Sequence, residues 1–188
     1  MSRRLEPPNP PLGNERITLQ PLTQKDRAAA WAMVQDEDIQ RFTYLPSSGA
    51  DEAYIGRWLG RYESGWKEGS CAGFSLRDAA GGDFLGFAAL VHLDLADRQA
   101  EIGYMLAPAA RGRGAALGAV ELLTRWGFEE LGLERLELRI DVENEASQRL
   151  AERAGYRLEG VLRSLAFKEG RRADTGVWSR LPTDKLTS

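Results

Sequence analysis

The chain alternates between two hydrophobic periods, and together they predict a mixed α/β fold. Alternation is clearest over 135–142, where Leu, Ile and Val occupy every second position and charged residues lie between them. Other strand-like runs cover 17–22, 72–77, 84–95, 101–106, 156–163 and 175–181. Apolar residues three and four apart predict helices over 28–34, 51–66, 115–131 and 144–154. We therefore expect a sheet of six or seven strands with about four helices.

Length and composition narrow the organisation. The 188 residues, 43% of them hydrophobic, suit one domain with a real core. Four of the eight prolines lie within residues 1–15, which predicts a flexible Pro-rich arm before a single domain at 16–182 and a tail at 183–188. A net charge of −3 does not favour nucleic acid as a partner.

Cysteine content and hydropathy suggest a compartment. Cys71 is the only cysteine, which excludes an intrachain disulfide and a Cys-based zinc site and fits a reducing cytoplasm. No apolar run approaches the roughly 18 residues of a membrane helix. No apolar stretch follows Arg3 and Arg4 as it would in a signal peptide. We expect a cytoplasmic protein that binds neither membrane nor nucleic acid.

The segment Arg111-Gly112-Arg113-Gly114-Ala115-Ala116 carries the strongest functional signal. It joins a strand-like run to a long helix-like run, so unpaired amides and the helix dipole meet at one point. Glycines let the main chain approach an anion, and the arginines add forked donors. This pattern predicts a phosphate or pyrophosphate site, although a Gly/Arg loop is more often a plain turn.

Other phosphate-binding classes fit the segment poorly. No Gly-Lys-Ser/Thr sequence ends it, which excludes a P-loop. A dinucleotide-binding turn needs three spaced glycines, and this loop has two. The loop is also not repeated, unlike arginine-glycine RNA-binding segments.

The order of motifs around this turn resembles the GNAT superfamily of N-acyltransferases. The motifs are Ala-Glu-Ile-Gly-Tyr at 100–104, the turn at 111–116, Asn-Glu-Ala-Ser at 144–147, Glu-Arg-Ala-Gly-Tyr at 152–156 and Glu-Gly-Val-Leu-Arg at 159–163. They are most similar to the RimJ/RimL branch. The resemblance covers about 17–181 and implies a mostly antiparallel GNAT-like sheet with a splayed central strand pair.

The resemblance also implies an acetyl-CoA site, with acetyl-CoA as co-substrate and no metal. The amides of the turn, Arg111, Gly112, Arg113, Gly114, Ala115 and Ala116, would hold the CoA pyrophosphate. Tyr104 and Leu106 would offer backbone contacts to the pantetheine arm, and Asn144 would reach the same region. A wedge between strands leaves amides unpaired, and an amide-rich ligand can satisfy them.

Acyl transfer to an amine needs a base and a proton donor to the leaving thiolate. Glu101 is our candidate base, acting through a water, because a carboxylate among apolar groups can have a raised pKa. Ser147 is the candidate donor, since position 151, where many members of the superfamily have tyrosine, is Ala151. The structural alternatives are an ion-paired strand glutamate and a serine that bonds to the local backbone.

Other reactive or binding residues have weaker support. His92 could act as a base and Cys71 could carry an acyl group, but structural roles are commoner for both. Trp58 or Trp66 could line an acceptor groove rather than the core. The acidic trio at 36–38 fits a solvated face better than an acceptor site, and 168–172 has the composition of a hairpin tip.

We therefore expect an N-acetyltransferase that transfers an acetyl group to a primary amine by direct attack in a ternary complex. The branch implies the α-amine of a protein N-terminus, of the ribosomal-protein type, as acceptor, and is consistent with a homodimer. One alternative is a small-amine acetyltransferase acting on a polyamine, an aminoglycoside or an amino-acid analogue. Two others are a non-catalytic acyl-CoA-binding module and a nucleotide-binding protein.

Overall fold

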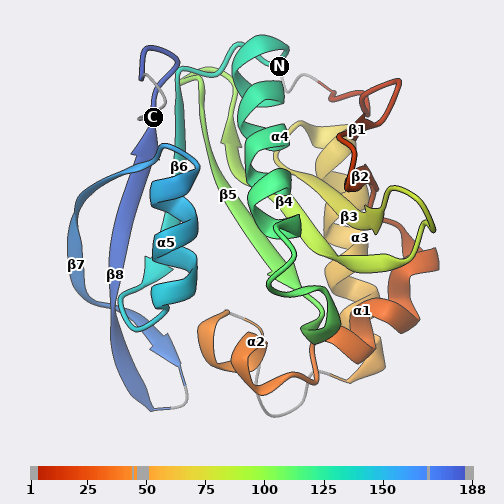
Figure 1. Cartoon of the computed structure of the whole chain (residues 1–188), viewed down its shortest axis with the longest axis horizontal. Helices are drawn as coiled ribbons and strands as arrows, with labels where there is room; N and C mark the ends of the chain where they lie inside the picture. Colours follow the sequence, from red (N-terminus) through yellow and green to blue (C-terminus); the bar gives the residue numbers. More distant parts are fainter. Residues whose placement is uncertain (1–3, 44, 46–50, 169, 185–188) are drawn as a thin grey trace.

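The computed structural model describes residues 4–43, 45, 51–168 and 170–184, without the side chain of Lys168. Its eight strands form one sheet in the order β1-β2-β3-β4-β5-β6-β8-β7 (Figure 1). The strands are β1 (Leu12–Gly13), β2 (Ile17–Pro21), β3 (Ala72–Asp78), β4 (Phe84–Asp94), β5 (Gln99–Leu106), β6 (Arg135–Asp141), β7 (Arg157–Lys168) and β8 (Arg171–Arg180). The α-helices are α1 (Arg27–Met33), α2 (Glu37–Phe42), α3 (Glu52–Glu68), α4 (Ala115–Glu129) and α5 (Glu145–Arg153), with 3₁₀ turns at Gln24–Asp26 and Pro108–Ala110.

Every neighbouring pair of strands is antiparallel except β5 and β6. These two central strands are parallel and pair over three residues only, from Gln99↔Arg135 to Glu101↔Glu137. Beyond that point β5 pairs with β4 alone and β6 with β8 alone. The sheet is therefore split into two arms that separate after Glu101.

Helices cover both faces of the sheet and divide the core in two. α4 and α5 lie on one face, where Ile102, Leu136 and Leu138 are buried with the apolar side of α4 (Figure 1). α1 and α3 lie on the other face, where Phe87 and Met105 pack beneath them. Alternation along β5 assigns even positions from Ala100 to Leu106 to the α4–α5 face and odd positions to the α1–α3 face.

Short polar side chains set where the helices begin. Thr23 makes a capping box with Asp26 at the first 3₁₀ turn. Asp51 accepts a hydrogen bond from the Tyr54 amide at the start of α3, and Asn144 accepts one from the Ser147 amide at the start of α5. Because α5 begins shortly after the end of β6, the Asn144 cap fixes Ser147 at the open end of the β6 arm.

The predicted fold class is confirmed, while the element counts differ. The sheet has eight strands rather than six or seven, because β1 is a two-residue strand inside the proline-rich segment. α2 was not predicted, since it has only six residues and three acidic residues lie at its start. β7 and β8 extend to Lys168 and Arg171 and form a hairpin, but Glu169 at its tip lies outside the described residues.

The segment expected to be a flexible arm contacts the domain at two places. Leu5 is buried, and its amide donates to the Trp66 carbonyl at 2.9 Å. Leu12 and Gly13 pair with β2. Residues 1–3 of the arm and 185–188 of the tail lie outside the described residues.

Candidate active site

The two separating arms leave main-chain groups of β5 without a strand partner. The Ala107 amide donates to the Leu85 carbonyl at 2.9 Å, on the β4 side. Hydrogen bonding in an antiparallel pair alternates, so the main-chain groups of Leu106 and Tyr104 point the other way, toward β6. The paired part of β6 ends level with Glu101, and among the described residues no strand meets these groups. This edge is suited to an extended amide ligand.

The turn before α4 has the geometry expected of an anion site. Gly112 and Gly114 have φ of 74° and 78°, which only glycine adopts readily. Gly114 is the N-cap of α4 and provides no side chain to accept the first-turn amides. Those amides, at Ala115 and Ala116, have no acceptor within the helix. The turn therefore presents free donors and the positive end of the α4 dipole.

Three arginines surround this turn, and they behave differently. The Arg111 guanidinium binds Asp36 and, at 3.0 Å, Asp38, both at the start of α2. In the described part of the chain, Arg113 is exposed and no carboxylate pairs with it or with Arg16. An Arg16 side-chain nitrogen lies 3.1 Å from the point where a Cβ on Gly114 would stand. Arg16, just before β2, therefore adds a cation at the turn.

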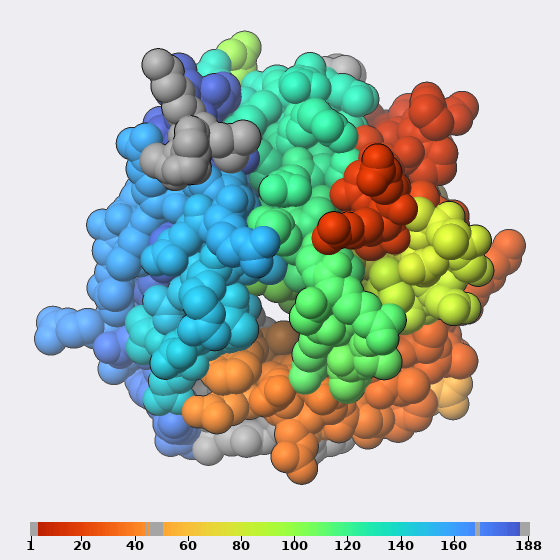
Figure 2. All heavy atoms as spheres, viewed as in Figure 1, coloured from red at the N-terminus to blue at the C-terminus, as the bar shows by residue number. Residues whose placement is uncertain are grey.

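α2 lies at the open end of the two arms and is fastened on both sides. Asp36 and Asp38 tie its start to Arg111, and Arg41 at its end binds Glu143 at 2.9 Å. Arg171, from the β7–β8 hairpin, binds the same Glu143 oxygen at 2.7 Å. Figure 2 shows an opening through the molecule between α5, the turn before α4 and α2.

Glu101 lies at the vertex of the splay, on the α1–α3 face of β5. Its side chain is 17% exposed, and a carboxylate oxygen lies 3.5 Å from the Nε of Arg139, on β6. Burial raises the pKa of Glu101 above its usual value, while the charges of Arg139 and His92 act to lower it and that of Glu137 to raise it. A largely buried carboxylate with a raised pKa is suited to accept a proton near neutral pH.

The Glu101–Arg139 contact is one end of a chain of ion pairs across the sheet. Arg139 also contacts Glu137 at 3.4 Å, and Glu137 binds Arg135 at 2.8 Å. Arg135 in turn binds Glu159 on β7 at 2.7 Å. Hydrogen bonds from Arg135 and Ser179 hold the pKa of Glu159 at about 2. This series of ion pairs places charges of alternating sign side by side next to Glu101.

Ser147 and Tyr104 meet across the splay on the opposite face. Ser147 is half-buried in the first turn of α5, where the side chain of Asn144 accepts its amide at 3.1 Å. The Tyr104 hydroxyl is buried, and no described residue meets it at full hydrogen-bond distance and angle, although the Ser147 side chain lies close enough to act on its pKa. Burial raises the pKa of Tyr104, and the nearby Ser147 side chain acts to lower it. The structure thus brings together Tyr104, Asn144 and Ser147, while Glu101 faces the other side.

The remaining candidates lie outside this arrangement. His92 is exposed at an irregularity of β4, where its φ is 49°. It acts on the pKa of Glu101 through its charge. Burial raises the pKa of the Cys71 thiol, which packs against α3. Trp58 packs against Tyr62 and Phe87 in the core, and Trp66 packs against Phe74 and Trp126. Both tryptophans are therefore buried core residues.

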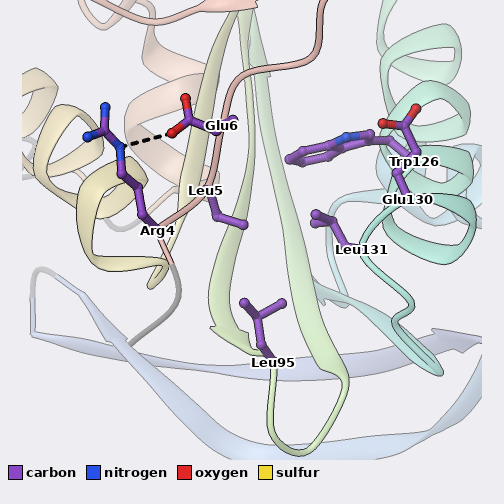
Figure 3. Close-up of a pocket in the computed structure, with 7 residues that line it drawn as sticks. All are labelled: Arg4, Leu5, Glu6, Leu95, Trp126, Glu130 and Leu131. Atoms are coloured by element: carbon purple, nitrogen blue, oxygen red, sulfur yellow. Dashed lines mark ion pairs between the residues drawn. The ribbon is translucent and has the colours of Figure 1, made fainter. Parts of the chain in front are cut away.

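A pocket lies at the other end of α4 (Figure 3). Leu5, Leu95, Trp126 and Leu131 form its apolar walls, and Arg4 and Glu6 pair with each other at its rim. α4 has 15 residues, so this pocket is roughly 22 Å from the turn. It is separate from the site formed by the splay.

Sequence reasoning missed Arg16, Arg139 and the role of Asp36. The alternation at 135–142 did place Arg139 on the polar side of its strand, but its distance from Glu101 depends on the parallel register of β5 and β6. The acidic trio was expected to be a solvated face, and two of its members instead bind Arg111. No local pattern indicates that Arg16 lies beside Gly114.

Comparison with known proteins places these features in a family. Residues 16–157 match the model of the acetyltransferase (GNAT) domain. A putative ribosomal N-acetyltransferase, YdaF of Bacillus subtilis (strain 168), is 33% identical over 175 residues, 89% of this chain and 92% of that protein. Spermidine N(1)-acetyltransferase of Escherichia coli (strain K12) is 33% identical over 89 residues, 47% of this chain and 48% of that protein. A crystal structure of a probable acetyltransferase superposes with a TM-score of 0.81 at 27% identity, covering 90% of this chain and 94% of that one.

The chain belongs to the GNAT acetyltransferase family. It is an N-acetyltransferase that uses acetyl-CoA as its acetyl donor. This assignment replaces the alternatives of a non-catalytic module and of a nucleotide-binding protein. In the described part of the chain, no helix is long and apolar enough to span a membrane.

Proposed function

We propose that the protein acetylates the α-amine of a protein N-terminus by direct attack on acetyl-CoA in a ternary complex. The observation that carries this proposal is the position of Glu101 at the vertex of the splay, on the face opposite to Ser147. A base on one face and a donor on the other suit a reaction in which the amine and the thioester approach from opposite sides. Neither side chain needs to move through the sheet.

The cofactor would be held mostly by the main chain. The amides of the turn from Arg111 to Ala116 would bind the pyrophosphate, with Arg16 and Arg113 as nearby cations. The outward-facing groups of Tyr104 and Leu106 would pair with the amides of the pantetheine arm. Asn144 would reach the same arm from the start of α5. These contacts would direct the thioester into the splay.

Glu101 would accept the proton that the attacking amine loses, through a bridging water. Arg139 holds the carboxylate at 3.5 Å and keeps its charge partly compensated. The sulfur would take a proton from Ser147, whose position Asn144 fixes. No covalent acyl-enzyme is needed, and Cys71 packs against α3 rather than in the splay.

The charges around the opening favour a protein N-terminus over a polyamine. Five carboxylates there are already compensated: Asp36 and Asp38 by Arg111, Glu101 and Glu137 by Arg139, and Glu143 by Arg41 and Arg171. A polyamine carries several positive charges and needs uncompensated carboxylates along its length. A protein N-terminus presents a single amine. Relatives named for both acceptor types exist, so the charge balance is what separates the two proposals.

A CoA-release assay tests the choice of acceptor. We expect turnover with short peptides that have a free N-terminal Ser, Ala or Met, and mass spectrometry should place the acetyl group on the α-amine. The matched controls are the same peptides with a blocked N-terminus, which leave only side-chain amines. Faster turnover with spermidine or spermine than with every free peptide would contradict the proposal and support the small-amine alternative.

We also propose that two copies associate through β7. This strand is the edge of the sheet and exposes Leu158, Val161, Leu162, Leu165 and Phe167. An apolar edge strand with unpaired main-chain groups favours pairing with another strand. Sedimentation at micromolar concentration should give a dimer mass that Leu165→Asp with Phe167→Asp converts to a monomer mass. A monomer mass for the unmodified protein would contradict the proposed dimer.

A further inference from the structure

The Tyr104 hydroxyl is a buried polar group without an assigned role. It belongs to the arm of β5 that no longer pairs with β6, and its ring packs against the core beneath α4 and α5. Buried hydroxyls in folded proteins are nearly always hydrogen-bonded, and this one has no partner among the described residues. An unsatisfied group of this kind indicates a bond that forms only when another molecule or rotamer is present.

Ser147 is the residue placed to complete that bond. It comes from the other arm, on α5, and its side chain is near enough to act on the pKa of Tyr104. Asn144 fixes the Ser147 main chain through the 3.1 Å cap, so only the rotation of the serine hydroxyl is left free. Ser147 is also half-exposed, whereas the Tyr104 oxygen is fully covered. Ser147 therefore lies between Tyr104 and the solvent-accessible splay.

A lone serine is a poor proton donor, because its alkoxide is very unstable in an apolar site. A second hydroxyl that donates to the serine oxygen stabilises the developing charge and turns the serine hydrogen outward. Burial keeps Tyr104 protonated near neutral pH, which is the state that this task requires.

We propose that Tyr104 is a positioning residue that orients the Ser147 hydroxyl toward the sulfur of CoA and resupplies its proton. The inference rests on the acyl transfer proposed above. As the new N–C bond forms and the C–S bond breaks, the amine proton passes to Glu101 through water. The sulfur takes the Ser147 proton and Ser147 takes the Tyr104 proton; after CoA leaves, solvent in the splay returns a proton to Tyr104 by way of Ser147 and deprotonates Glu101. Atoms and charges balance without a further reactant.

The test compares Tyr104→Phe, Ser147→Ala and the double variant. Phenylalanine keeps the ring and its packing, so the acetyl-CoA Kd should stay within about twofold of the unmodified protein. The kcat of each single variant should fall by about 10- to 100-fold at saturating acceptor, within the range of lost acid catalysis. Because the two hydroxyls act in series, the double variant should be no slower than the slower single variant.

Three outcomes would overturn the proposed proton relay, in which Tyr104 supplies a proton to Ser147 and Ser147 supplies one to the sulfur. These are unchanged kcat in Tyr104→Phe, multiplied losses in the double variant, or loss of acetyl-CoA affinity that accounts for the whole effect. If the unmodified protein turns over no amine at all, the proposed function itself fails, and the relay fails with it. Normal turnover by the unmodified protein and by Tyr104→Phe defeats the relay alone.

A second measurement does not depend on removing the hydroxyl. Site-specific replacement of Tyr104 by 3-fluorotyrosine keeps its size but makes the hydroxyl more acidic. The relay predicts that the alkaline limb of the kcat profile then moves to lower pH, because the donor loses its proton earlier. An alkaline limb at the same pH in both proteins would contradict the relay.

Discussion

The two faces of the splay use different chemistry. On the α4–α5 face the candidate site consists of main-chain groups, two glycines at positive φ and two hydroxyls, Ser147 and Tyr104. On the α1–α3 face it consists of charged side chains in a chain of ion pairs that starts at Glu101. The first face suits one constant ligand with fixed amide and phosphate groups. The second suits variation, because each charge depends on its neighbours.

The same difference decides what could be read from the sequence. The turn at 111–116 and the Asn144 cap are local, so a few consecutive residues predict them. The Glu101–Arg139 contact joins strands whose paired residues are 36 positions apart in sequence, from Gln99↔Arg135 to Glu101↔Glu137, and follows only once that register is known. α2 was missed because six residues carry too little periodicity. The burial of Leu5 was not predicted, because one apolar residue in a proline-rich segment forms no periodic pattern.

The largest expected effect comes from removing the base on the α1–α3 face. Glu101→Gln keeps the size of the side chain but cannot accept a proton, so kcat should fall by at least about 100-fold. The acetyl-CoA Kd should change little, because Glu101 faces away from the cofactor turn. Glu134→Gln is the control, since that carboxylate is exposed and, among the described residues, pairs with Arg98 on the surface. A kcat within a few-fold of the unmodified protein at every pH would rule out Glu101 as base.

Straining the turn on the α4–α5 face should give the next largest effect. Gly114→Ala forces a side chain into φ 78° with Arg16 only 3.1 Å from the new Cβ. That conformation costs about 1–2 kcal/mol for a non-glycine residue, so the free turn should relax out of it. Acetyl-CoA must then restore the conformation on binding, and the Kd should weaken roughly tenfold. Calorimetric titration measures this directly.

Gly132→Ala is the matched control for the turn. Gly132 has φ 68° and open space around its Cβ position, but it lies beyond the far end of α4. It should lower stability by a similar amount and leave the acetyl-CoA Kd unchanged. Equal loss of affinity in both variants would show that backbone strain, rather than the turn, is responsible.

Removing the positive charge of Arg139 or the negative charge of Glu137, both beside Glu101, should move the pH profile in opposite directions. Glu101 acts when deprotonated, so its raised pKa moves the acidic limb of kcat/KM above the usual pH for a glutamate. Arg139→Gln removes a cation that lowers this pKa, so the limb should move to higher pH. Glu137→Gln removes a carboxylate that raises it, so the limb should move to lower pH. Shifts in the same direction would contradict the ion-pair account.

The smallest expected effect concerns stability rather than activity. Asp36→Ala removes the 3.0 Å cap on the Ile39 amide and the ion pair with Arg111, and should lower the free energy of unfolding by about 1–2 kcal/mol. Burial acts to raise the pKa of Asp36, but the bonds from Arg111 and Ile39 lower it overall. The stabilisation is therefore present above the unfolded-state pKa and is lost as pH falls through the folded-state pKa. Urea unfolding at neutral and acidic pH measures it, with the exposed Glu37→Ala as control; an equal loss at both pH values would contradict the ion-pair contribution.

The most direct test of this division of labour is a side-by-side titration of acetyl-CoA into the unmodified protein, Gly114→Ala and Glu101→Gln. We predict a Kd about tenfold weaker for Gly114→Ala and within about twofold of the unmodified protein for Glu101→Gln. A Kd that weakens equally in both variants, or only in Glu101→Gln, would contradict the assignment of the cofactor to the α4–α5 face.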